Sequence, residues 1–125
     1  MGKGVRYGVI GDVHCEEKRL EESITTLLKA GAETLIQVGD IVDGRGSLER
    51  CVELLKVHDV HTIAGNHERW FLAGDMRSLP DATLQTDEAS RSYLASLPPT
   101  RRFETSQGDL LVCHGVGEDD MVNLR

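Results

Sequence analysis

The sequence has no long apolar run, and this shortage excludes a membrane-spanning protein. Its longest uninterrupted apolar stretch is only a few residues, whereas a helix that crosses a bilayer needs about 20. The first four residues, Met-Gly-Lys-Gly, also lack the apolar stretch of a secretory signal peptide. We therefore expect a cytoplasmic protein with no membrane partner.

Positive charge is also in short supply. The 125 residues include 14 Lys and Arg against 21 Asp and Glu, which gives a net charge of −7. A negative surface repels phosphate backbones, so we expect no nucleic acid to bind through a basic face. An acidic protein that handles phosphate needs a local source of positive charge, and a metal ion is the obvious candidate.

Cysteines are few, and their number is odd. Cys15, Cys51 and Cys113 are widely spaced in apolar surroundings, which is typical of reduced core thiols rather than of a disulfide framework. The hydrophobic share of 39% and the charged share of 28% are typical of a globular domain. With no internal repeat and no linker, the sequence predicts one domain over residues 1–125.

Strand and helix signals alternate over the first half of the chain. Apolar, β-branched runs at 5–10, 34–38 and 60–64 predict buried strands. Helical spacing of apolar residues follows the first run, and again follows Ser47, which we expect to be an N-cap. The β-α-β-α-β order predicts an α/β fold with a mainly parallel sheet and right-handed crossovers.

The second half is less regular. The pattern predicts a helical start and then a loop over residues 70–84, and a helix over 89–97 that Pro98 and Pro99 end. Residues 101–105 and 109–113 predict either a hairpin or two adjacent strands.

Polar side chains fall just past the ends of the predicted strands. They are Asp12 and His14, Asp40 and Asp43, Asn66 and His67, and finally His114. Ligands of open α/β sheets bind beyond the carboxyl ends of the strands, so we expect these side chains to converge on one edge. Oxygen donors from Asp and Asn with nitrogen donors from His suit Mn, Fe, Zn or Mg.

The spacing of Asp12 and His14 adds a geometric expectation. In extended chain, residues two apart project to the same side, so both would face one ion while Val13 and Cys15 face the core. Taken alone, Asp12 is equally explained as a turn residue that caps the next helix. The joint occurrence of all these blocks in one order favours the metal site.

The blocks resemble the signature of the calcineurin-like metallophosphoesterase superfamily, which runs D-x-H, G-D-x-x-D, G-N-H-[ED], H-G and G-H-x-H. The chain matches the first four at residues 12–14, 39–43, 65–68 and 114–115. The Gly-Asn-His-Glu form looks most like the branch that holds protein serine/threonine phosphatases and diadenosine tetraphosphatases. The resemblance implies a layered α/β sandwich that binds two divalent metal ions.

The resemblance also implies metal ligands. Asp12 and His14 would hold the first metal, Asn66 and His114 the second, and Asp40 would bridge the two. The implied activity is hydrolysis of phosphate esters by a hydroxide that the two metals activate.

The remaining implied roles concern the substrate. His67 would be the general acid that protonates the leaving oxygen, and Asp43 would orient its imidazole. Asn66, Arg45 and Arg69 are candidates to bind the phosphate, although Arg45 lies one position later than the branch's phosphate-binding arginine. A solvated loop arginine remains the alternative for both arginines.

The G-H-x-H block is absent from the sequence. The two histidines not yet assigned, His58 and His61, lie at the amino-terminal edge of the third predicted strand, and we expect both outside the site. We also expect the second sheet of the sandwich to be incomplete, because the chain is either truncated or a short variant.

Two function classes remain open. The first is an active phosphoesterase whose substrate is a small phosphorylated molecule, a nucleotide or a phosphoprotein. The second is a catalytically impaired domain that binds metal or phosphate and acts by association, with a partner or a second copy of the chain covering the incomplete sheet.

Overall fold

Three short parallel strands form the centre of the structure, a computed structural model that describes residues 5–42, 44, 46–73 and 87–114. The strands β1 (Tyr7–Ile10), β2 (Thr34–Gln37) and β3 (His61–Thr62) pair in that order. The predicted α/β class and parallel sheet are confirmed. Each strand is shorter than its apolar run, because residues at one or both ends of the run lie outside the paired strand.

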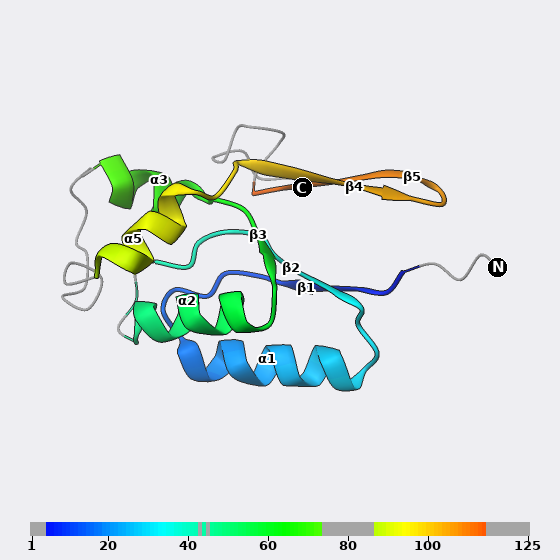
Figure 1. The fold of residues 1–125 in the computed structure, drawn as a ribbon, viewed down its shortest axis with the longest axis horizontal. Helices are drawn as coiled ribbons and strands as arrows, with labels where there is room; N and C mark the ends of the chain where they lie inside the picture. Colours follow the sequence, from blue (N-terminus) through cyan, green and yellow to red (C-terminus); the bar gives the residue numbers. More distant parts are fainter. Residues whose placement is uncertain (1–4, 43, 45, 74–86, 115–125) are drawn as a thin grey trace.

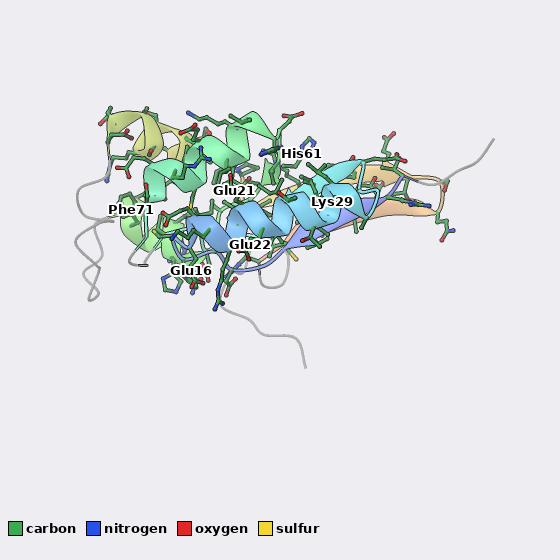
Figure 2. The ribbon with its side chains drawn as sticks, turned by 90° about the horizontal axis from the view of Figure 1, so that it is seen from below. Glu16, Glu21, Glu22, Lys29, His61 and Phe71 are labelled. Atoms are coloured by element: carbon green, nitrogen blue, oxygen red, sulfur yellow. The ribbon has the colours of Figure 1, made fainter. Side chains whose placement is uncertain are left out.

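Two helices, α1 (Glu17–Lys29) and α2 (Leu48–Val57), cover one face of this sheet (Figure 1). Leu20 and Ile24 of α1 are buried in the larger hydrophobic core, which lies between the helices and the sheet. Ser47 is the N-cap of α2 as predicted, and its hydroxyl accepts a hydrogen bond from the Arg50 amide at 3.1 Å. Figure 2 views the molecule from the side of α1, whose labelled Glu21 is exposed.

A hairpin of β4 (Thr100–Thr105) and β5 (Gly108–Cys113) lies over the opposite face of the sheet (Figure 1). A smaller core cluster of Ile36, Ile63 and Val112 joins the two layers. The ring of Phe103 packs edge-on against Tyr7, with 5.8 Å between centroids. The hairpin alternative is thus confirmed, and the second sheet has two strands within the described residues.

Helices α3 (Asn66–Ala73) and α5 (Glu88–Ala95) complete the described part of the chain. Helix α3 begins at Asn66, with three residues between it and the end of β3, rather than at residue 70. Asp87 caps α5 by accepting the Ser90 amide at 2.8 Å. Within the described ranges, no helix has the length and apolarity needed to cross a membrane.

Candidate metal centre

Four segments of the chain bring acidic and imidazole side chains together around Asp40. Asp12 and His14 follow β1, Asp40 follows β2, His67 lies in the first turn of α3, and His114 follows β5. The distances from Asp40 Oδ2 to the Nε2 atoms are 3.2 Å for His114, 3.9 Å for His14 and 4.0 Å for His67. The Asp40 side chain is 7% exposed and that of Asp12 is 54% exposed, so the site opens to solvent on the Asp12 side.

Two glycines allow the ends of β2 and β3 to approach closely enough to build this site. Gly39 has a φ of +95°, and a Cβ there would lie 2.6 Å from the amide nitrogen of Gly65. A Cβ on Gly65 would lie 2.6 Å from Asp40 Oδ1 and 3.1 Å from the His114 ring. A larger residue at Gly39 would displace Gly65, and a larger residue at Gly65 would displace Asp40.

The turn after β1 is not the extended chain that the spacing of Asp12 and His14 predicted. His14 and Cys15 both have left-handed backbones, with φ of 44° and 62°. The amides of Val13 and His14 donate to the Asp40 carbonyl at 3.0 and 2.9 Å. The turn still places Asp12 Oδ2 and His14 Nε2 3.8 Å apart and buries Cys15 in the core, so the predicted sides are right although the predicted backbone is wrong.

Backbone carbonyls fix how two of the imidazoles face the site. His14 Nδ1 lies 2.9 Å from the Val42 carbonyl oxygen, and His114 Nδ1 lies 2.7 Å from that of Val38. A carbonyl oxygen only accepts, so each Nδ1 donates to its carbonyl, and each Nε2 is turned toward Asp40. A cation at this site would lie between the imidazole nitrogens and the carboxylate. This is how metal-binding histidines are usually oriented.

Two groups of three residues in the described part of the chain have the spacing of a metal site. One group is His14, Asp40 and His67, the other is Asp12, Asp40 and His114, and the ligand atoms of each group lie within 4.8 Å of one another. Asp40 belongs to both, which is the geometry that a bridging carboxylate requires. The groups combine the other ligands differently from the predicted sets, so the assignment of each ligand to one metal stays a prediction.

The structure describes two of the four other predicted site residues. Asn66 begins α3, and its side-chain oxygen is buried. Arg69 is exposed on α3. Asp43 and Arg45 lie outside the described residues. The roles predicted for these four residues therefore stay predictions.

The histidines expected outside the site do lie outside it. His58 is the exposed C-cap residue of α2. His61 begins β3, and its ring packs edge-on against Phe103 with 5.2 Å between centroids. Neither belongs to the two ligand groups.

Glu68 is a residue of the site region for which the sequence predicted no role. Its side chain is fully buried. Its Oε1 accepts from the amides of Asp40 at 2.6 Å and Gly65 at 2.8 Å, and its Oε2 accepts from Ile41 at 2.7 Å and Val42 at 3.0 Å. Burial raises the pKa of the Glu68 carboxyl, and the amide hydrogen bonds, which favour the carboxylate, oppose that rise. The sequence feature that could have indicated a role for Glu68 is its position directly after Gly-Asn-His.

Gln37 was missed as well. This fully buried side chain donates from Nε2 to the carbonyls of Gly11 at 2.9 Å and Gly39 at 2.6 Å, and its Oε1 accepts from the Gly39 amide at 2.8 Å. It therefore holds the ends of β1 and β2 together just before Asp12 and Asp40. The sequence feature that could have indicated a role for Gln37 is its position as a single polar residue at the end of an apolar strand.

A parallel sheet whose strand ends surround a shared carboxylate with imidazoles defines an α/β protein with a candidate metal site. The sequence model of the calcineurin-like phosphoesterase family matches residues 5–124. The chain belongs to this family, and the predicted resemblance is confirmed. The proposed branch stays a prediction.

A solved structure with a similar fold is the crystal structure of a metallophosphoesterase from Sphaerobacter thermophilus. It is 28% identical with a TM-score of 0.55, and the match covers 79% of this chain and 44% of that one. The chain thus matches less than half the length of this structure. Among curated proteins, no sequence matches the chain.

Proposed function

We propose that this chain is a metal-dependent phosphoesterase that hydrolyses phosphate esters at the Asp40 site. The observation that carries the proposal is the Asp40 carboxylate, which faces the Nε2 atoms of three histidines and belongs to both ligand groups. Their donor set fits two divalent cations of the Mn, Fe, Zn or Mg type. Such cations supply neutralisation of phosphoryl oxygens and a lowered pKa for a nearby water.

Other residues of the chain orient the candidate metal ligands and bind the phosphate group. Asp40 would be the ligand shared by both cations, and the Val42 and Val38 carbonyls fix the rings of His14 and His114. Asn66, Arg45 and Arg69 are our candidates to bind the phosphate group. The substrate class we propose is a small phosphorylated molecule, a nucleotide or a phosphoprotein.

His67 is our candidate for the general acid. Its side chain is 27% exposed, so a ligand in the site reaches it, and its ring packs edge-on against His14 with 4.9 Å between centroids. A leaving alkoxide needs a proton, and histidine is the side chain that most often donates one in such a step. We expect Asp43 to orient the imidazole.

The test compares two substrates whose leaving groups differ. Phenyl phosphate needs a proton on its departing oxygen, whereas 4-nitrophenyl phosphate releases a stable anion. In the manganese-loaded protein, His67→Ala should lower turnover of phenyl phosphate by about 10²-fold or more and turnover of 4-nitrophenyl phosphate much less. Metal content, measured by elemental analysis, should stay at the wild-type value.

His58→Ala is the matched control, because this histidine is exposed at the end of α2 and should change neither turnover nor metal content. Two bound metals without metal-stimulated hydrolysis would contradict the enzyme proposal and favour an impaired binding domain that acts through a partner. Loss of metal in His67→Ala would contradict the acid role and make His67 a ligand, as its group with His14 and Asp40 allows.

A further inference from the structure

Glu68 joins two of the segments that build the metal centre. Three of the four amides it accepts belong to the consecutive residues Asp40, Ile41 and Val42, and the fourth is that of Gly65. The Gly65 amide precedes Asn66 and His67, so one buried carboxylate links the Asp40 segment to the start of α3.

The Asp40 segment needs such a partner because its backbone is strained. Asp40 has a φ of +58° directly after Gly39 at +95°, and the left-handed region is unfavourable for a residue with a Cβ. Successive amides in such a turn point to one side and form a concavity that attracts an anion. In this chain the anion is the side chain of Glu68.

The same short segment orients two ligands at once. Asp40 supplies its carboxylate, its carbonyl accepts the His14 amide at 2.9 Å, and the Val42 carbonyl accepts from the His14 ring at 2.9 Å. A shift of this segment would therefore move Asp40 and His14 together. The amide of His67 also donates to Asp40 Oδ1, at 3.1 Å, which ties the third member of this group to the same carboxylate.

We propose that Glu68 is a positioning residue for the metal centre: its carboxylate holds the Asp40–Val42 segment and Gly65 in the arrangement that binds divalent cations. The proposal rests on the metal site of the proposed function but not on hydrolysis. Glu68 would thus change the metal affinity without binding the metal itself, because it positions the residues that do.

The test measures Mn²⁺ binding to the metal-free chain by titration calorimetry, together with thermal unfolding by circular dichroism. Glu68→Gln keeps the shape of the side chain but replaces one acceptor oxygen by an amide, whose N–H groups would point at backbone donors. We expect its dissociation constant for Mn²⁺ to rise at least about tenfold, the usual effect of losing a group that orients metal ligands.

Thr62→Val is the matched control. Thr62 is also a buried polar residue, and its hydroxyl bonds to the Val60 carbonyl and to Tyr93 rather than to the ligand loops. We expect it to lower thermal stability while its Mn²⁺ affinity stays within twofold of wild type. Glu68→Asp keeps both acceptors on a shorter side chain, so its affinity should lie between those of wild type and Glu68→Gln.

Three results would overturn the proposal. Glu68→Gln could bind Mn²⁺ as tightly as wild type, or Thr62→Val could lose affinity to the same extent, which would make the effect one of general stability. Unfolding of both Glu68 variants in excess Mn²⁺ would show that the carboxylate holds the whole domain. A wild-type chain that binds no Mn²⁺ would instead contradict the metal site of the proposed function, and this outcome is read from the wild type alone.

Discussion

The parallel sheet and the hairpin hold their parts of the metal centre in different ways. In β2, three of four residues are buried, and the helices add most of the larger core. In β4 and β5, Val112 is the one buried residue. The sheet half supplies Asp12, His14 and Asp40, whereas the hairpin delivers His114 alone. The candidate ligands therefore differ in how firmly the structure fixes them.

Attachment of the hairpin depends on a few specific contacts. The His114 ring donates to the Val38 carbonyl at 2.7 Å, and Arg101 Nε donates to the Thr62 carbonyl at 2.9 Å. Regions with few buried apolar side chains open at a lower free energy than the core does. We infer that His114 is the candidate ligand most readily withdrawn from Asp40.

The largest expected effect that separates the two halves comes from their glycines. Gly39→Ala should lower the free energy of unfolding by about 4 kcal/mol, because it adds backbone strain and a Cβ in close contact with Gly65. Gly108→Ala in the hairpin turn should cost only about 1 to 2 kcal/mol, since its φ is +120° but nothing lies within 4 Å of the added Cβ. Urea unfolding followed by circular dichroism measures both.

Gly11→Ala is the control for these glycine variants, because its Cβ would also meet nothing within 4 Å and its φ is not in the strained range. It should leave the unfolding midpoint nearly unchanged. Equal losses at Gly39 and Gly108 would show that the end of β2 has room to relax, and the contrast between a rigid and a loose half would then be wrong.

A second difference lies in the cysteines. Cys15 and Cys51 of the sheet half are fully buried, whereas Cys113 at the end of β5 is partly exposed. Burial raises the pKa of the Cys51 thiol to about 12, so its thiolate fraction at pH 8 is about 10⁻⁴. A disulfide reagent should label Cys113 in the native protein and should reach Cys51 only on unfolding. Mass spectrometry of time points reports the order, and early labelling of Cys51 would contradict the packing of the sheet half.

The same pKa gives a pH dependence. The folded-state pKa of Cys51 lies above its ordinary value of 9.0, so the folded state favours the neutral thiol. Its contribution to stability is complete below about pH 9 and is lost as the pH rises toward 12. The urea midpoint of the wild type should therefore fall more between pH 8 and pH 10.5 than that of Cys51→Ala. Parallel curves would exclude this cysteine as the cause.

The sequence predicted the sheet half better than the details of the site. Parallel strands and the cap at Ser47 follow from local periodicity and from the side chain that precedes a helix, and both are present. The convergence of Asp12 and Asp40 followed from the rule that the ends of parallel strands share one edge, whereas His114 arrives from β5 of the separate hairpin. These signals are local or topological, so a single sequence contains them.

The role of Glu68 could not be predicted in this way. Its partners in the Asp40 segment are 26 to 28 residues away, and they are backbone amides, which carry no sequence signal of their own. The left-handed backbones of His14, Cys15 and Asp40 are likewise set by contacts between loops. This is why the extended geometry at residues 12–14 was wrong, although the side chains of Asp12 and His14 do lie close to each other.

The smallest expected effect tests whether surface charge, rather than packing, holds the two strands of the hairpin together. Arg102 and Asp109 form an ion pair across β4 and β5 at 3.2 Å, with side chains that are 63% and 46% exposed. Exposed pairs contribute little, so Asp109→Asn should change the free energy of unfolding by less than about 0.5 kcal/mol, as should Glu53→Gln, which removes the Arg50 pair on α2. The measurement is urea unfolding at low salt and at 1 M salt, where screening should remove even this difference. A larger, salt-sensitive loss at Asp109 alone would mean that charge, rather than packing, holds the two strands of the hairpin to each other.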